Sequence, residues 1–254
     1  MTAVDINCDL GEAFGVYQLG DDQQMMLSIS SANVACGYHA GDPRIMQRTV
    51  RMAKEHGVAV GAHPGFPDLG GFGRRNMMLG PDEIYTDVLY QLGALAAFCL
   101  AVGVEMQHVK PHGQLNNMAF ANHGMAKAIV QAIYDFNPQL YVISYGGALS
   151  QEATSLGLRV AHEIYADRTY HPDGTLVSRE TPGSVIHDPD IVVDRVATMV
   201  KRGAIVAQNG VWVPTPIDTI CVHGDTPGAP LLAQRIRNRL AEIGIAVMAF
   251  GQPR

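Results

Sequence analysis

The sequence lacks paired cysteines. Four cysteines are spread through its 254 residues, and no two of them form a Cys-x-x-Cys spacing. A disulfide framework or a cysteine zinc site needs such clustering, so we interpret them as reduced thiols and expect a cytoplasmic protein. They are Cys8, Cys36, Cys99 and Cys221.

Positive charge and membrane signals are also scarce. The chain carries 18 lysines and arginines against 24 aspartates and glutamates, a net charge of −6. This balance argues against nucleic acid or an anionic membrane as a partner, because both select basic surfaces. No basic N-terminal region precedes an apolar run, so no signal peptide is expected. The longest apolar stretch, residues 88–104, contains Gln91 and two glycines and predicts a buried helix, not a membrane span.

Several short catalytic signatures are absent as well. No P-loop (GxxxxGKS or GxxxxGKT) occurs, and the glycine-rich residues 65–73 do not follow a strand as a Rossmann fingerprint would, so any nucleotide would bind without a P-loop. There is no HExxH zinc motif. Ser144 and Ser150 lack the context of a nucleophile elbow, which argues against a serine hydrolase.

What the chain does contain is a regular alternation of short apolar runs and longer helical patterns. The runs predict strands at 3–10, 31–36, 58–63, 106–111, 140–144, 159–166, 218–224 and 245–250. The patterns between them predict helices near 21–30, 43–56, 81–103, 119–136, 147–156, 189–202 and 227–243. A helix, a glycine and a strand follow one another four times, at Gly57, Gly103, Gly157 and Gly244, as helix C-caps do. No linker interrupts this repeat, so we expect one α/β domain over residues 1–254.

Polar clusters follow most of the predicted strands. They end the first, second, third, fourth and sixth strands and the one near residue 220. An open doubly wound sheet gathers its ligand groups at one switch point, whereas a barrel gathers them from many strand ends at one mouth. The distribution therefore favours a single-domain (β/α) barrel.

Four histidines end apolar runs and are followed within two residues by glycine or proline. They are His39, His63, His112 and His223. Packing can explain one such histidine, but four at equivalent positions of a repeated unit would converge in a barrel. Asp9, His63 and His112 come from three strand ends, a common way to build an open divalent-metal site. The same groups could instead be general acids and bases, and the sequence leaves this choice open.

Cationic side chains accompany these histidines. Lys110 lies between an apolar run and Pro111, so its ammonium is expected to point into the mouth, where it could bind an anion, stabilise an oxyanion or act as a desolvated base. Residues 70–75 form a glycine-rich loop that ends in Arg74 and Arg75. Such a loop could close over an anionic group, or it could be a plain surface loop with solvated arginines.

The first strand places its polar residues on one side. Asp5, Asn7 and Asp9 alternate with apolar residues and are expected to face the barrel interior. Asp9 would lie nearest the mouth and Glu12 on the loop beyond it. Asp5 lies deeper, so we expect it to be a buried hydrogen-bonding partner and not a catalyst.

With these clusters assembled, the chain resembles the LamB/YcsF family of 5-oxoprolinase A subunits along essentially its whole length. The resemblance is carried by "DINCDLGE", "ANVACGYHAGDP", "GAHPGFPDLGGFGRR", "VKPHGQLNN", "EIYADRTY" and "CVHGDTPG". It implies a seven-stranded (β/α) barrel like those of the polysaccharide-deacetylase superfamily. It also implies the ATP-driven opening of 5-oxo-L-proline to L-glutamate together with partner subunits B and C.

This reaction suggests roles for the polar residues. If ATP phosphorylates the amide oxygen of the lactam, the site needs a cationic clamp, a group for the substrate carboxylate and a base for water. The residues expected to be catalytic are Asp9, Glu12, His39 and Lys110. Those expected to bind substrate are Asn7, Arg74, Arg75, Asn116, Glu163 and His223. By analogy with deacetylase-like barrels, a divalent metal would be held by Asp9, His63 and His112.

Two other functions remain open from the sequence. The chain could be a metal-dependent deacetylase or glycoside-active barrel that works alone. It could also be a non-catalytic scaffold subunit that only binds partners. Its hydrophobic content of 47% allows a buried interface, so a homo-oligomer is possible as well.

Overall fold

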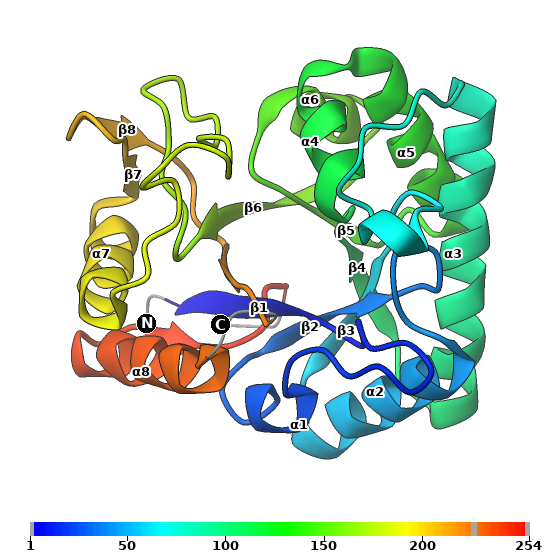
Figure 1. Cartoon of the computed structure of the whole chain (residues 1–254), viewed down its shortest axis with the longest axis horizontal. Coiled ribbons are helices and arrows are strands. Elements are labelled where there is room, and N and C mark those ends of the chain that lie inside the picture. The colour runs from blue at the N-terminus through cyan, green and yellow to red at the C-terminus, as the bar shows by residue number, and fades with distance from the viewer. Residues whose placement is uncertain (1–2, 225–227, 252–254) are drawn as a thin grey trace.

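The chain forms a closed barrel of parallel strands. The structure is a computed structural model that describes residues 3–224 and 228–251. In this part of the chain, neighbouring strands pair in the order β1-β2-β3-β4-β5-β6-β9, and β1 also pairs with β9, which closes a seven-stranded ring (Figure 1). These strands are β1 (Ala3–Leu10), β2 (Ser31–Ala35), β3 (Ala59–His63), β4 (Met106–Val109), β5 (Tyr141–Ser144), β6 (Arg159–Tyr165) and β9 (Thr219–Val222). A short strand, β10 (Ala246–Val247), pairs with the start of β1. The barrel expected from the polar strand ends is confirmed.

Helices surround the barrel and connect its strands (Figure 1). They are α1 (Asp22–Met25), α2 (Pro43–His56), α3 (Pro81–Val102), α4 (Gly113–Ala121), α5 (His123–Phe136), α6 (Gly147–Ser155), α7 (Pro189–Arg202) and α8 (Ala229–Glu242), with a 3-10 turn η1 (Leu69–Gly71). Local signals explain their limits. Asp42 caps α2 by accepting from the backbone N–H groups of Arg44 and Ile45, and Gly57 ends it in the left-handed region at φ 67°.

The structure corrects two predicted helices and adds a pair of strands that was not predicted. The helix expected over 21–30 is only the four residues of α1. The helix expected over 119–136 is two helices divided at Asn122, whose extended backbone breaks the first and whose side chain caps the second by accepting from the Met125 N–H. An antiparallel pair, β7 (Ala204–Val206) and β8 (Trp212–Pro214), was not expected.

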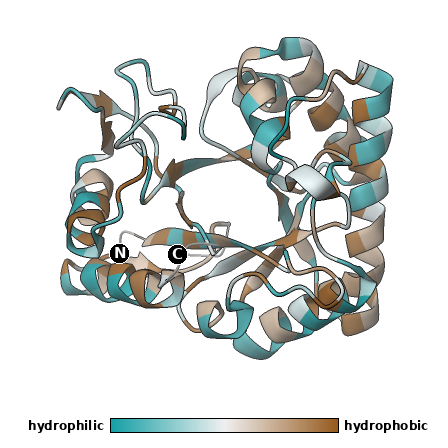
Figure 2. Ribbon diagram, viewed as in Figure 1, coloured by the Kyte–Doolittle hydropathy of each residue, from teal (hydrophilic) through white to brown (hydrophobic). Residues whose placement is uncertain are grey.

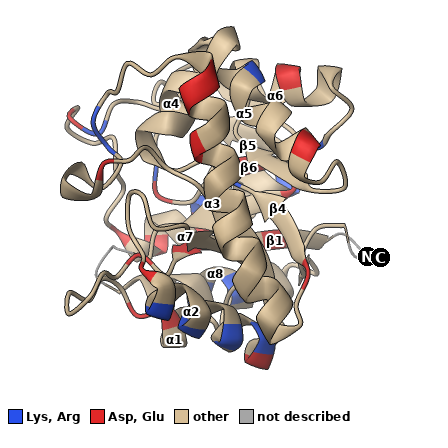
Figure 3. Cartoon of the chain, turned by 90° about the vertical axis from the view of Figure 1, so that its right-hand side faces the viewer, with Lys and Arg blue, Asp and Glu red and all other residues tan. Residues whose placement is uncertain are grey.

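Helix α3 buries only one of its sides. Val88, Leu92 and Leu95 are buried, whereas Tyr90 and Leu100 are 63% and 84% exposed, so the helix expected to be buried is buried on one side only. Apolar residues cover much of its length (Figure 2), and its charged residues lie near the end at which it begins (Figure 3). Among the described residues it is the one helix long and apolar enough to cross a membrane, a test that the core helix of a soluble protein also passes.

Candidate active site

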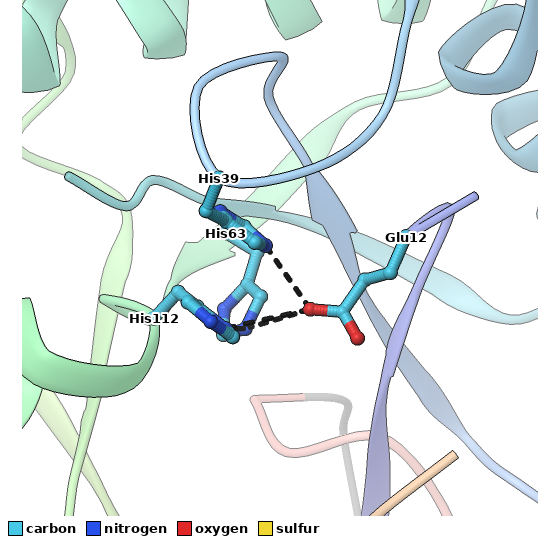
Figure 4. A group of neighbouring side chains, drawn as sticks. All are labelled: Glu12, His39, His63 and His112. Carbon is cyan, nitrogen blue, oxygen red and sulfur yellow. Dashed lines mark hydrogen bonds and ion pairs between the residues drawn. The ribbon is translucent and has the colours of Figure 1, made fainter. Parts of the chain in front are cut away.

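Four side chains at the mouth of the barrel converge on one point (Figure 4). Glu12 follows β1, His39 follows β2, His63 ends β3 and His112 precedes α4. Glu12 Oε1 lies 3.0 Å from His39 Nε2, 3.4 Å from His112 Nδ1 and 3.9 Å from His63 Nε2. All four residues are buried, and one ligand atom from each lies within 4.8 Å of the others. We call Glu12, His39, His63 and His112 the imidazole–carboxylate group.

The hydrogen bonds of two histidines orient their lone pairs toward this point. His63 Nδ1 lies 2.6 Å from the Lys110 carbonyl oxygen, and His112 Nε2 lies 2.8 Å from the Phe72 carbonyl oxygen. A carbonyl oxygen only accepts, so each of these nitrogens carries the proton. In the neutral rings the other nitrogens, His63 Nε2 and His112 Nδ1, are then acceptors, and they lie 3.0 Å apart. Two lone pairs at this distance need a proton or a cation beside them.

Burial disfavours a proton on two of the rings. It lowers the pKa of His39 well below the usual range, and the nearby His63 lowers it further. Burial, His39 and His63 likewise hold the pKa of His112 well below its usual range. His39 Nδ1 is also buried and has no hydrogen-bond partner among residues 3–224 and 228–251. Three imidazoles and one carboxylate therefore fit a divalent transition metal better than an added proton.

Two glycines make room for the stacked rings of this group. The His39 and His112 rings are parallel to within 3°, with centroids 3.7 Å apart. A Cβ atom on Gly73 would come within 2.8 Å of both side chains, and one on Gly65 would come within 2.6 Å of His39 Nδ1. The glycine-rich loop thus contributes space for the imidazoles.

Lys110 forms a second cluster beside the imidazole–carboxylate group. Its Nζ lies 2.8 Å from Glu163 Oε1 and 3.1 Å from Asp9 Oδ1, and it donates to Asn7 Oδ1 at 3.1 Å. Burial by itself would lower the pKa of Lys110, but Asp9, Cys221 and Glu163 reverse this and hold it well above its usual range. The carboxylates around Lys110 thus favour its cationic form, which suits binding an anion more than acting as a desolvated base.

Asp9 joins the two clusters. Its Oδ2 lies 3.3 Å from His63 Nε2, and its Oδ1 accepts from Asn33 Nδ2 at 2.8 Å. Burial would raise its pKa, but His63 and Lys110 hold the pKa of Asp9 well below the usual range, so it is ionised at neutral pH. The metal ligands expected from the sequence were Asp9, His63 and His112. The structure adds Glu12 and His39 to His63 and His112. Asp9 Oδ2 lies closer to His63 Nε2 than Glu12 Oε1 does, 3.3 against 3.9 Å, while Asp9 Oδ1 pairs with Lys110.

A hydrogen-bonded polar network fills the barrel below Lys110. Asp5 accepts from Ser30 and Ser31 at 2.6 and 2.7 Å and from Thr219, which in turn accepts from Asn7 at 2.7 Å. Asn7 also donates to Glu163 Oε1 at 3.0 Å. Asp5 is a fully buried hydrogen-bonding partner, as the alternation along the first strand predicts.

A cavity of about 570 Å³ opens over these clusters. The expected site residues that line it are Asp9, His63, Arg74, Lys110, His112, Asn116 and His223. Four others, Asn7, Glu12, His39 and Glu163, lie buried behind its wall. Arg75 does not line the described cavity; its side chain is 70% exposed and pairs with Asp68. Arg74 is thus the arginine of this loop that faces the cavity.

Several cavity residues did not emerge from the sequence. Tyr145, Tyr165, Arg168 and Arg179 line the cavity. His223 Nδ1 lies 2.8 Å from Asp167 Oδ1, and its Nε2 lies 2.9 Å from Arg179 Nη2. The polar run "EIYADRTY" at the end of β6 could have signalled Asp167 and Arg168. Arg179 lies in a long loop whose approach to the barrel has no local signal. Residues 225–227 of "CVHGDTPG" lie outside the described part of the chain.

Together these features define an α/β-barrel protein with a metal-type donor group and a buried lysine at one cavity. The LamB/YcsF family model matches residues 4–254, and the chain belongs to this family. The A subunit of the 5-oxoprolinase of Thermococcus onnurineus is 53% identical over 250 residues, covering 98% of each chain. That of Pyrococcus furiosus is 53% identical over 249 residues, also covering 98% of each chain.

Solved structures agree with this assignment. A lactam utilization protein from Thermus thermophilus superposes with a TM-score of 0.94 at 46% identity, over 98% of this chain and 100% of that one. A more distant likeness is the catalytic domain of a peptidoglycan N-acetylglucosamine deacetylase from Eubacterium rectale. It has a TM-score of 0.52 at 11% identity and covers 99% of this chain and 90% of that one, so it shows a common fold alone.

Proposed function

We propose that the chain is the A subunit of a 5-oxoprolinase, which opens 5-oxo-L-proline to L-glutamate with hydrolysis of ATP to ADP and phosphate. Its relatives are named as A subunits of 5-oxoprolinase and as a lactam utilization protein, and these names support this substrate. The observation that carries the proposal is the meeting of Lys110 with two imidazoles, His63 and His112, at one cavity. An amide carbonyl bound there would have the Lys110 ammonium beside its oxygen, and the lone pairs of the two imidazoles would help to hold a Lewis-acidic metal, as amide hydrolysis requires.

The imidazole–carboxylate group would hold a divalent metal. Its residues Glu12, His39, His63 and His112 present three nitrogen ligands and one oxygen ligand. When bound, the ion supplies a Lewis acid that polarises the lactam carbonyl.

The side chains of the chain itself perform the remaining steps. Lys110, held as a cation, stabilises negative charge on the carbonyl oxygen. Asp9, ionised and beside the cavity, accepts a proton from the attacking water. Water adds to the carbonyl carbon, the ring C–N bond breaks, and the nitrogen gains a proton and becomes the amino group of glutamate. Arg74 binds an anionic group of the substrate.

ATP would overcome the stability of the unstrained lactam. In this scheme ATP phosphorylates the amide oxygen, water adds to the activated carbon, and the ring C–N bond breaks to leave an acyl phosphate of glutamate. A second water then hydrolyses this acyl phosphate to glutamate and phosphate. The sequence contains no P-loop. We therefore place the nucleotide with partner subunits B and C in a cytoplasmic complex. The exposed apolar side of α3 offers a surface for such assembly.

Reconstitution tests the proposal. The chain is co-expressed with candidate subunits B and C, and glutamate release from 5-oxoproline is measured with and without ATP. We expect release only with all three subunits and ATP, and a loss of about a hundredfold or more in Lys110→Ala and Asp9→Asn. Arg159→Gln, on the same barrel but at the beginning of β6, is the control. Release that persists without this chain, or in both site variants, would refute the proposal.

A second candidate is a metal-dependent hydrolase that works alone, which the imidazole–carboxylate group favours. It predicts turnover of amide or ester substrates by the isolated, metal-loaded chain without ATP. A third, the non-catalytic scaffold, predicts that Lys110→Ala and Asp9→Asn leave the activity of the full complex intact. The same reconstitution therefore separates all three.

A further inference from the structure

We propose that Arg168 and Arg179 form an oxyanion-binding subsite in the cavity, distinct from Lys110 and the imidazole–carboxylate group. Both arginines line the cavity, and neither belongs to the machinery described above. The ring of Tyr165 connects the two regions. Lys110 Nζ lies 5.6 Å from its centroid, and the His223 ring stacks on it with centroids also 5.6 Å apart.

Arg168 is a buried cation with an unused donor. Its residue is only 7% exposed, and its Nη2 donates to the Val177 carbonyl oxygen at 2.5 Å. Its Nε is buried and has no hydrogen-bond partner in the described part of the chain. A buried guanidinium normally satisfies its donors, since an unsatisfied one is costly, so an acceptor on a ligand in the cavity would complete this geometry.

The charged residues next to Arg168 do not supply an acceptor for its Nε. Burial lowers the pKa of Arg168, and the positive charge of Arg179 lowers it further. The adjacent carboxylate, Asp167, accepts from His223 Nδ1 through both oxygens, at 2.8 and 3.0 Å. Two guanidinium groups that lie close enough to repel each other are stabilised by an anion between them.

Other polar groups at the cavity also favour a bound anion. Helix α4 begins at Gly113 without a side-chain cap, and its first residues Gln114 and Asn116 line the cavity. A helix N-terminus favours negative charge. Arg74 also lines the cavity. Among the described residues, the carboxylates that line the cavity are Asp9 and the exposed Glu180.

The ligand chemistry is that of a carboxylate or a phosphoryl group. Both present oxygen acceptors that match the fork of a guanidinium. For the function proposed above, on which this assignment rests, the source is either the carboxylate of 5-oxoproline or the phosphoryl group of its activated form. The subsite would orient the lactam so that its carbonyl faces Lys110.

Direct binding tests the subsite without any need for turnover. The isolated chain is titrated calorimetrically with 5-oxo-L-proline, with inorganic phosphate, and with 2-pyrrolidinone, the same lactam without a carboxylate. We expect the wild-type chain to bind at least one of the two anions. In Arg168→Gln and in Arg179→Gln the dissociation constant for that anion should rise by about tenfold or more. Weakened binding of 5-oxoproline identifies the carboxylate as the ligand, and weakened binding of phosphate identifies the phosphoryl group. Binding of 2-pyrrolidinone should not change.

Two further variants control the result. Arg159→Gln removes an arginine that, like Arg168, donates to a backbone carbonyl, but at the beginning of β6, and should bind both anions as the wild type does. Because Arg168→Gln could disturb the loop held through Val177, the exposed Arg179 provides an independent measurement.

The proposal is overturned if neither anion binds the wild type at 10 mM, about ten times the upper end of the usual range of KM values. It is also overturned if Arg179→Gln and a folded Arg168→Gln bind both as the wild type does. Failure of the reconstituted complex to release glutamate, with these binding losses intact, would refute the proposed function and leave the subsite standing.

Discussion

Single buried charges determine the chemistry of the barrel mouth. Lys110 is nearly inaccessible, yet Asp9 and Glu163 keep it charged. Burial favours the neutral form of the His39 and His112 imidazoles and outweighs the attraction of Asp9 and, for His112, that of Glu12. The Lys110 cation and neutral imidazoles thus lie side by side, and the charge state of each depends on the groups around it.

Replacing Lys110 should destabilise the protein strongly. Lys110→Met leaves the carboxylates of Asp9 and Glu163 buried without their cation, and we expect the free energy of unfolding to fall by about 3–5 kcal/mol. Urea denaturation measures this change. The double variant Lys110→Met with Glu163→Gln removes one of the stranded charges and should recover part of the loss. A single variant within about 1 kcal/mol of the wild type would contradict this account.

Metal binding should depend on Glu12 more than on Asp9. Glu12→Gln replaces the carboxylate that lies among the three imidazoles, and we expect metal affinity to fall by about a hundredfold. Asp9→Asn should retain metal, since Asp9 is held by Lys110 and Asn33. Elemental analysis after dialysis against limiting zinc compares the two. Loss of metal from Asp9→Asn with retention in Glu12→Gln would restore the set of ligands expected from the sequence.

Asp5 should make stability depend on pH. Burial raises its pKa in the native state to about 6 from 3.8. The native state therefore binds the proton more tightly than the unfolded chain, and this contribution to stability falls as pH rises from 4 through 6. The difference corresponds to about 3 kcal/mol. Unfolding of Asp5→Asn, compared with the wild type from pH 4 to 7, should lack this component; parallel pH profiles would contradict it.

At the level of elements, the loops after the strands matter most for the site. Asn122 divides a helical region in two, and the first of these helices, α4, begins directly after His112. The loop after β3 passes over the site and places Gly65 and Gly73 against the imidazoles. Inside the barrel, the ring of His108 occupies the space beside Gly61 of β3 that a side chain would fill. His108 Nε2 lies 2.8 Å from Asn33 Oδ1.

A side chain on Gly61 should therefore disrupt the barrel interior. A Cβ atom there would come within 2.0 Å of the His108 ring, which its buried position keeps in place. We expect Gly61→Ala to lower the free energy of unfolding by about 1–3 kcal/mol. Gly93→Ala, on the exposed side of α3 with no atom near its Cβ, should instead raise it by about 0.5–1 kcal/mol. Equal effects of the two substitutions in thermal or urea unfolding would contradict this reasoning.

At the level of the whole molecule, closure of the sheet brings distant segments together. The imidazole–carboxylate group takes its members from residues 12 to 112, and the cavity adds side chains up to residue 223. A ligand bound in the cavity would contact loops that follow several different strands. Binding should therefore stabilise the fold as a whole.

Metal should accordingly raise the midpoint of thermal unfolding. At a free metal concentration a hundred times the dissociation constant, the native state gains about 2.7 kcal/mol, which corresponds to a rise of roughly 5–10 °C. Calorimetry with zinc and with a chelator measures the shift. Glu12→Gln should show little of it, while Arg159→Gln should show it in full. An equal shift in Glu12→Gln would place the bound metal elsewhere.

Much of the architecture could be predicted from local patterns. The four glycines between helix and strand, such as Gly57 and Gly103, occupy left-handed backbone as expected. The histidines after apolar runs do gather at one rim. What local patterns did not predict were Glu12 and His39 as partners of His63, and the arginines of the long loop after β6, because their positions depend on loops that pack against other segments.

The sequence by itself determined the barrel and the side of each strand that faces inward. Strand periodicity and helix caps are properties of neighbouring residues, so Asp5, Asn7 and Asp9 could be placed from residue types alone. Only the tertiary structure decided which atoms meet. Its hydrogen bonds direct the lone pairs of His63 and His112 at each other, and its ion pairs hold Asp9 against Lys110. These contacts join residues tens of positions apart, and their distances follow from chain closure and loop packing, which no local pattern encodes.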